Sequence, residues 1–272
     1  MEIEQSNQNP DSQYFIMALS TEIPGLYRYA HSITGSKEEA EDLVGDTIVR
    51  AIERAEQYRN EASLKTWLHS ILYHLAIDRA RHNAHEISVK DVEILWRDDS
   101  YSVNAEAVAE RAESADELRE ALIHLPHHYR NAVVLHDGEG FSANEVAAIL
   151  DISLPAAKQR IRRGRMMLVS ALAQQEERRA ANVGVPLGCW DAREQISSYI
   201  DGELDSSERA MLEAHLAKCA TCPPLYQALA GTTVSLGRLH DPNTVIPATL
   251  ADRIRRYLYS DQAHRTMNRG RE

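Results

Sequence analysis

All three cysteines of this 272-residue chain lie in one short stretch, from Cys189 to Cys222. Two of them end the run His215-Leu-Ala-Lys-Cys219-Ala-Thr-Cys222. A capping box at Asp205-Ser-Ser-Glu208 predicts a helix that places His215 and Cys219 one turn apart on one face. Cys222 would follow on a tight turn, and Cys189 can close a tetrahedral Cys3His site. The sequence therefore predicts one bound Zn2+ per chain, with the ligands Cys189, His215, Cys219 and Cys222.

Two other uses of the cysteines remain open at this stage. They could be buried and chemically inert, or a pair of them could cycle through a disulfide without any metal. The chain shows no apolar run long enough to span a membrane and no signal-peptide pattern at its N-terminus. We therefore expect a cytoplasmic protein that does not contact a membrane, and in that compartment thiols stay reduced.

The rest of the chain is typical of helices. Ala, Leu, Glu and Arg are plentiful while Gly, Pro and Phe are scarce, which favours helix over sheet. After the capping box at Ser36-Lys-Glu-Glu39, apolar residues from Ala40 to Ala55 recur at helical spacing, and Glu41, Asp42 and Asp46 fall outside that stripe. The predicted fold class is all-α, with several small helical bundles rather than one large core.

A helix-turn-helix is predicted between residues 142 and 168. Ser142-Ala-Asn-Glu145 is a capping box, and Asp151-Ile-Ser153 supplies the turn. Ser153 can cap the next helix, in whose first turn Pro155 is well placed. This second helix could enter a DNA major groove, with the remaining polar side chains left for solvent or phosphate: Lys158, Gln159, Arg160, Arg162, Arg163 and Arg165.

The net charge of −11 does not exclude DNA binding, because the charge is segregated. Acidic residues dominate from Glu86 to Glu120, whereas the helix from Lys158 to Arg165 carries only basic charges. Local charge decides the affinity for phosphate. A solvated basic helix in an ordinary bundle is the alternative.

Two blocks of the sequence resemble the extracytoplasmic-function (ECF) class of bacterial sigma factors. The first comprises Ala40-Glu-Asp-Leu-Val-Gly-Asp-Thr-Ile-Val-Arg-Ala51 and Ser63-Leu-Lys-Thr-Trp-Leu-His-Ser-Ile-Leu-Tyr-His-Leu-Ala-Ile-Asp-Arg79, which look like sigma region 2. The second comprises Leu125-Pro-His-His-Tyr-Arg-Asn-Ala-Val-Val-Leu135, Phe141-Ser-Ala-Asn-Glu-Val-Ala-Ala-Ile-Leu150 and the basic helix, which look like region 4. The two blocks cover most of residues 14–175.

The resemblance implies partners and residue roles. RNA polymerase core would dock at Asp42 and Asp46, and melted promoter DNA would lie against Arg59, Lys65, Trp67, Tyr73 and Arg79. Trp67 taken alone is better explained as a core residue than as a base-stacking one. Region 4 would read the minus-thirty-five element through the helix that begins near Pro155. The acidic stretch 86–113, which is only weakly periodic, would be an extended linker threaded through the polymerase cleft.

A third stretch, Cys189 to Cys222, resembles the zinc-binding anti-sigma domain, with the run Tyr199-Ile-Asp-Gly-Glu-Leu204 as part of the match. The domain organisation expected from the two resemblances is region 2 at 14–85, a linker at 86–113, region 4 at 114–179, a zinc-binding domain at 188–234 and a basic tail at 235–272.

We therefore expect a sigma factor that carries its own zinc-binding domain, which contacts the sigma regions within the same chain and regulates them. The fusion alone motivates the regulatory role. Two alternatives are a helix-turn-helix regulator that works without polymerase, and an interaction protein that recruits a partner through its zinc domain. Nothing in the sequence resembles a catalytic triad, a phosphate-binding glycine loop or a carboxylate pair, so no enzymatic activity is expected.

Overall fold

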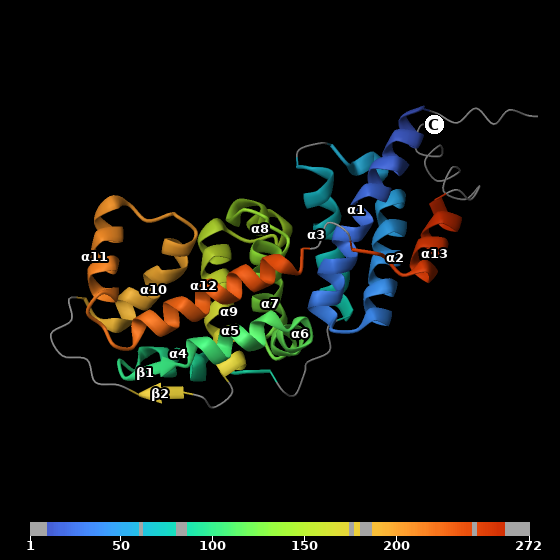
Figure 1. Ribbon diagram of the computed structural model, residues 1–272. Helices are drawn as coiled ribbons and strands as arrows, with labels where there is room; N and C mark the ends of the chain where they lie inside the picture. Colours follow the sequence, from blue (N-terminus) through green and yellow to red (C-terminus); the bar gives the residue numbers. More distant parts are fainter. Residues whose placement is uncertain are drawn as a thin grey trace, which may run out of the picture. The chain divides into compact units, whose positions relative to one another are not determined.

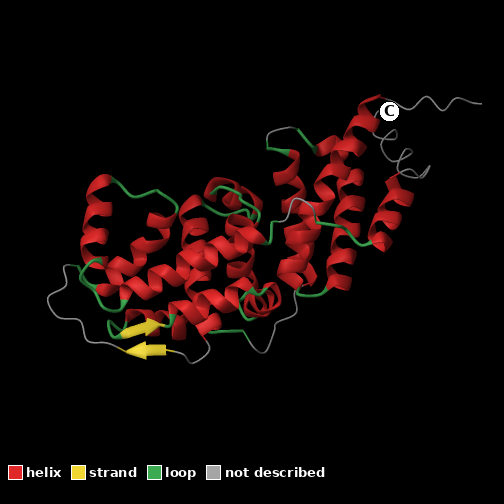
Figure 2. Cartoon of the chain, in the orientation of Figure 1, coloured by secondary structure: helices red, strands yellow, loops and turns green. Residues whose placement is uncertain are grey.

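The computed structural model describes residues 10–59, 62–79, 86–173, 177–179, 187–240 and 244–258. The predicted all-α class is confirmed, and the strands among these residues form one small antiparallel pair (Figure 2). The chain divides into two compact units, residues 1–80 with 241–272 and residues 81–240, which we describe separately. The polar N-terminal end, most of the break at 182–188 and the end of the basic tail lie outside the described residues. No helix in the described ranges is long and apolar enough to cross a bilayer.

The first unit contains α1 (Pro10–Thr34), α2 (Lys37–Glu53), a short 3-10 turn (Ala55–Gln57), α3 (Leu64–Arg79) and α13 (Ala248–Leu258). The helices α1, α2 and α3 pack against one another around buried Leu26, Leu43 and Leu72. Ser36 caps α2 as predicted, since its hydroxyl accepts the amide of Glu39 at 3.3 Å. The apolar stripe from Ala40 to Ile52 is buried. The C-terminal helix α13 packs on α2 (Figure 1).

The second unit contains all the remaining elements. In chain order they are α4 (Val89–Arg97), β1 (Tyr101–Val103), α5 (Ala105–Glu113), α6 (Ala115–Ile123), α7 (His127–Val133), a π-helical turn (Val134–Gly138), α8 (Ala143–Ile149), α9 (Leu154–Ala173), β2 (Glu177–Arg179), α10 (Cys189–Ile200), α11 (Ser206–Leu216) and α12 (Cys222–Arg238). Helix α9 contacts α4 to α8 from the preceding chain and also α10 and α12 from the cysteine-containing segment. The predicted region 4 and the predicted zinc-binding domain therefore share one core.

The expectation that the acidic stretch 86–113 is an extended linker is wrong. The stretch forms α4, β1 and α5, and β1 pairs with β2 in the register Tyr101↔Arg179, Ser102↔Arg178 and Val103↔Glu177. Its few apolar residues explain the folding, because Val92, Trp96 and Val108 are all buried in the second unit. Weak periodicity in the sequence hid them, because each helix of this stretch spans only nine residues.

The predicted helix-turn-helix is formed by α8 and α9. Ser142 and Glu145 make the complete capping box, and the turn places Asp151 at φ 50°, in the left-handed region that Asp tolerates better than most residues. Ser153 caps α9 by accepting the amide of Ala156 at 3.4 Å. Helix α9 crosses α7 closely at Gly164, where a Cβ atom would overlap the Val133 side chain and lie 2.9 Å from the carbonyl oxygen of Tyr129.

We predict that Gly164→Ala destabilises the protein by about 1–3 kcal/mol, because the added methyl group overpacks the α7–α9 contact. Gly231→Ala in α12 is the matched control, since nothing lies within 4 Å of the position that its methyl group would take. That variant should instead gain up to about 1 kcal/mol from helix propensity. Urea unfolding followed by circular dichroism measures both changes, and equal effects of the two substitutions would contradict the close approach at Gly164.

Candidate metal centre and recognition-helix surface

The four predicted metal ligands converge in the second unit. Cys189 is the first residue of α10, His215 lies in the last turn of α11, and Cys222 begins α12. Cys219 lies beyond the end of α11, but its amide still donates to the His215 carbonyl at 2.9 Å, which keeps the two side chains together. All four residues are buried, and their ligand atoms lie within 4.8 Å of one another.

The spacing of these atoms fits a tetrahedral ion. The sulfurs of Cys189 and Cys219 are 3.7 Å apart, and none of the three thiols forms a disulfide. Zn–S bonds of about 2.3 Å in a tetrahedron separate two sulfurs by about 3.8 Å. Three thiolates and one imidazole are also a donor set that zinc prefers. The residues present therefore fit a Cys3His zinc site.

The turn between the last two ligands stabilises one thiolate. The amides of Thr221 and Cys222 donate to Cys219 Sγ at 3.4 and 3.3 Å. Burial opposes ionisation of Cys219, but hydrogen bonds from Thr221 and from these amides outweigh it and lower its pKa to about 6. Burial raises the pKa of Cys189 and of Cys222. Cys219 is thus the thiol best prepared to bind a cation.

Two residues beside this site were missed by the sequence reasoning. Arg193, only 1% exposed, donates to the carbonyls of Trp96, Asp98 and Tyr101, and Thr221 donates its hydroxyl hydrogen to the carbonyl of Asp99. A usable signal existed for Arg193, because it lies at helical spacing with the buried α10 residues Cys189, Ala192, Ile196 and Ser197.

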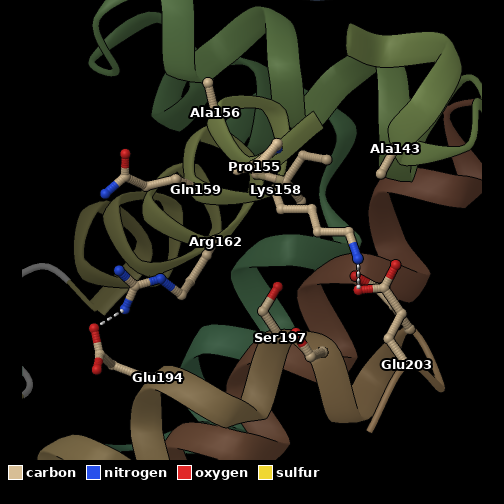
Figure 3. Close-up of a pocket in the computed structure, with 12 residues that line it drawn as sticks. Ala143, Pro155, Ala156, Lys158, Gln159, Arg162, Glu194, Ser197 and Glu203 are labelled. Atoms are coloured by element: carbon tan, nitrogen blue, oxygen red, sulfur yellow. Dashed lines mark hydrogen bonds and ion pairs between the residues drawn. The ribbon is translucent and has the colours of Figure 1, made fainter. Parts of the chain in front are cut away.

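Helix α10 and the chain that follows it face the basic surface of α9 (Figure 3). Lys158 Nζ lies 3.0 Å from a Glu203 carboxylate oxygen, and Arg162 Nη1 lies 2.8 Å from Glu194. Both ion pairs border a pocket between α9 and α10. Two cations that could hold DNA phosphates are therefore paired with carboxylates of the cysteine-containing segment.

Arg165 does not lie on the surface, so the expectation that it faces solvent or phosphate is wrong. Its side chain is 2% exposed and makes two hydrogen bonds to each of two carboxylates, those of Asp137 and Asp201, with N–O distances of 2.6 to 3.0 Å. Burial opposes its charge, yet the two carboxylates raise the pKa of Arg165 above its ordinary value. Partial burial opposes ionisation of the Asp201 carboxyl, whose side chain is 20% exposed, but hydrogen bonds from His136 and Arg165 outweigh it and lower its pKa to about 2. Long-range partners decide this burial, and the sequence pattern does not show them.

The other predicted contacts of α9 differ in exposure. Ser153, Pro155 and Gln159 are exposed, and Arg160 is half-buried. Arg163 Nε lies 2.7 Å from the carboxylate of Glu93 in α4, so a residue of the acidic stretch neutralises it. The exposed residues at the start of α9 are the ones that remain accessible for base edges.

In the first unit, the predicted DNA-contacting residues differ in exposure. Arg59 is exposed, while Lys65 and Trp67 are half-buried, and the Trp67 ring packs 5.1 Å from that of Tyr58. Tyr73 is only 4% exposed and belongs to the core, so its placement on a DNA-contacting surface is wrong. Arg79 is exposed and forms an ion pair with Asp46.

The two predicted polymerase-docking residues, Asp42 and Asp46, are exposed on α2, and α13 reaches one of them. Arg253 of α13 lies 3.1 Å from the Asp42 carboxylate and donates to the carbonyl oxygen of Glu41. Its guanidinium crosses α2 at Gly45, where an added Cβ would come within 3.1 Å of it. Leu250 and Ile254 anchor α13 because both are buried.

Three family models match the chain in succession. "Sigma-70 region 2" matches residues 19–86, "Sigma-70, region 4" matches 115–168 and "Putative zinc-finger" matches 189–222. The first match includes α2 and α3, and the second includes α8 and most of α9. The third begins at Cys189, ends at Cys222 and contains all four candidate ligands.

Several curated proteins are similar to about half of this chain. ECF RNA polymerase sigma factor SigE of Mycolicibacterium smegmatis is 32% identical over 152 residues, which are 55% of this chain and 58% of SigE. ECF RNA polymerase sigma factor EcfG of Rhodopseudomonas palustris is 30% identical over 55% of this chain and 80% of EcfG. ECF RNA polymerase sigma factor SigM of Mycobacterium tuberculosis is 31% identical over 54% of this chain and 71% of SigM.

A solved structure of the sigma factor RpoE in complex with the anti-sigma factor NepR from Bartonella quintana is also similar, at 24% identity. The match covers 60% of this chain and 99% of that chain, with a TM-score of 0.45.

We predict that Arg165→Ala destabilises the protein by about 3–5 kcal/mol, because it leaves Asp137 and Asp201 without their buried cation. Lys158→Ala removes a largely exposed pair and should cost about 1 kcal/mol or less. Chemical denaturation at neutral pH compares the two variants. Similar losses for both would contradict the assignment of Arg165 as the buried anchor between α9 and α10.

Proposed function

Because the chain belongs to the ECF RNA polymerase sigma factors, we propose that it directs RNA polymerase core to promoters and is restrained by its own C-terminal part. The ion pairs between α9 and the cysteine-containing segment are the observation that carries the restraint. For promoter DNA to bind α9, its phosphates must replace the carboxylates of Glu194 and Glu203. The segment 189–222 therefore acts as an internal competitor of DNA.

The tail supplies a second restraint on region 2. If Asp42 and Asp46 dock on polymerase, then α13 competes for that surface through Arg253 and its buried residues Leu250 and Ile254. A tethered competitor acts at millimolar effective concentration, so even a modest interface can hold it in place. The proposed role of the basic tail at 235–272 is therefore to cover the polymerase-docking surface of region 2.

Zinc is the metal proposed for the Cys3His site, with one ion per chain held by Cys189, His215, Cys219 and Cys222. Three thiolates, one imidazole and the 3.7 Å sulfur separation support this assignment. The ion would supply structural cross-linking, since all four positions are taken by protein ligands. It would hold the starts of α10 and α12 against the end of α11.

The proposed roles follow the expected domains. Residues 14–85 dock on polymerase and contact melted DNA. Residues 86–113 link this domain to region 4 at 114–179, and residues 188–234 bind zinc. Arg59, Lys65, Trp67 and Arg79 stay proposed contacts in region 2, and Ser153, Pro155, Gln159 and Arg160 stay proposed contacts in region 4. Polymerase and promoter as partners place the protein in the cytoplasm.

We predict that Glu194→Gln with Glu203→Gln in the full chain strengthens binding to a duplex carrying the promoter's upstream element. Freeing Lys158 and Arg162 adds two phosphate contacts, so the slope of log K against log salt should steepen by about 1.8. Fluorescence anisotropy at a series of salt concentrations measures both quantities. Promoter-dependent transcription with polymerase core should rise in parallel.

Glu106→Gln with Glu110→Gln is the matched control. Both glutamates are exposed on α5 and the double substitution changes the net charge by the same amount. If the control strengthens DNA binding as much as Glu194→Gln with Glu203→Gln, the change in net charge explains the effect. The proposal that Glu194 and Glu203 compete with DNA phosphates is then refuted.

We predict that Arg253→Glu raises the affinity of the full chain for polymerase core about tenfold, because it places like charges against Asp42 and Glu41 and detaches α13. Arg256→Glu is the control, since Arg256 is exposed and bonds only within its own helix at Asp252 among the contacts described. Titration of labelled protein with core enzyme gives both affinities. An unchanged affinity for Arg253→Glu would remove the tail from the proposed restraint.

A further inference from the structure

We propose that Arg193 and Thr221 couple the Cys3His site to residues 96–103, so that metal occupancy sets how firmly the backbone of this part of the linker is held. The inference rests on the proposed function in two respects, the zinc ion and the role of 86–113 as the linker between the sigma regions. It goes further by naming the residues that connect the two.

Arg193 holds the backbone of this segment at three points. Its Nη1 donates to the carbonyls of Trp96 and Asp98 at 2.5 and 2.8 Å, and its Nη2 donates to that of Tyr101 at 2.8 Å. The guanidinium is buried, so water does not compete for these bonds. One side chain of α10 therefore gathers three carbonyls of a segment almost a hundred residues earlier in the chain.

Thr221 makes the same connection from the metal-binding turn. Its hydroxyl donates to the Asp99 carbonyl at 2.9 Å and accepts from Arg193 Nη2 at 3.2 Å. Its own carbonyl accepts the Ser102 hydroxyl at 3.2 Å, and its amide donates to Cys219 Sγ. Thr221 lies between the ligands Cys219 and Cys222, so its position depends on both ligands being held.

Charge reinforces this geometry. A divalent ion bound by three thiolates and a neutral imidazole forms a cluster of net charge −1, and the Arg193 guanidinium lies beside Cys222 as a buried cation. The hydrogen bonds of Arg193 described above all go to neutral oxygens. A metal-thiolate cluster would therefore supply a counter-charge that makes its burial more favourable.

Loss of the ion removes both supports. The four ligands are then no longer drawn together, which frees the turn at Thr221, and the buried guanidinium loses its counter-charge. Among the described residues, the strand β1 pairs with the three residues of β2, and a ribbon of this length is marginal without tertiary support. The hydrogen bonds that hold the backbone of 96–103 to α10 should then open more readily, while the buried rings of Trp96 and Tyr101 keep their places in the core.

Hydrogen exchange of the full chain, read by mass spectrometry on peptides covering 96–103, tests the coupling. The zinc-loaded protein should protect this segment. Arg193→Gln should keep one zinc per chain, measured separately by metal analysis, while exchange in 96–103 rises about tenfold or more. Removing zinc from the unsubstituted protein with a chelator should raise exchange there by a similar factor. In Arg193→Gln, chelation should raise exchange in 96–103 little further, because the hydrogen bonds from Arg193 to this segment are already lost.

Two further variants keep the test decisive. Thr221→Val is nearly isosteric and should open the same segment by a smaller factor even if Arg193→Gln fails to fold. Arg209→Gln removes an exposed arginine of α11 that pairs with Glu213, and it should leave exchange in 96–103 unchanged. Protection of α7 and α9 reports that the second unit is folded in each variant.

The outcomes separate the inference from the function on which it rests. One zinc per chain with 96–103 still protected in Arg193→Gln and Thr221→Val would overturn the coupling and leave the proposed zinc site intact. Protection that survives chelation would do the same. A purified, reduced protein without zinc would overturn the proposed metal, and the coupling with it.

Discussion

The second unit depends on one buried cation. Arg165 of α9 binds Asp137, which follows α7, and Asp201, which ends α10. The helix-turn-helix and the cysteine-containing segment are thus joined by charge-assisted hydrogen bonds inside a shared core, in addition to the packing of α12 against α9. Burying a guanidinium is costly unless its charge and its donors are satisfied, so both carboxylates must stay in place. The position of α10 over the basic surface of α9 follows from this requirement.

Helix α10 also collects the other functional contacts of the unit. Within twelve residues it carries a metal ligand at Cys189, the linker contacts of Arg193 and the Glu194 partner of Arg162, and Asp201 caps its end. Residues on a rigid helix cannot move independently, so a change at the metal end alters the contacts along its whole length. One short helix thus connects the candidate metal ligands, the segment 96–103 and the basic surface of α9.

Much of this could be predicted from the sequence, and the exceptions share one cause. Capping at Ser142, the turn at Asp151 and the convergence of His215 with Cys219 depend on neighbours within a few residues, and the structure agrees with each. The burial of Arg165 and Tyr73 and the folding of 86–113 depend on partners far away in the chain. Helical periodicity identifies a face but not what covers it, so a basic residue on α9 was assigned to solvent although Asp201 covers it. The net charge of −11 gives the same lesson, because it averages over cations and the carboxylates that neutralise them.

The relative strength of the contacts on α9 indicates where release must begin. The pairs Lys158–Glu203 and Arg162–Glu194 are partly exposed, and such pairs contribute about 1 kcal/mol or less each. Phosphates can replace them at little cost. Separating Arg165 from Asp201 would leave a buried guanidinium with only one of its two carboxylates, which costs more than breaking an exposed pair. Under the proposed function, DNA alone would therefore gain too little at the edge of α9 to displace α10. A signal that loosens the Cys189 end of α10 would act on the helix from the opposite end, which would make the proposed metal site the better point of control.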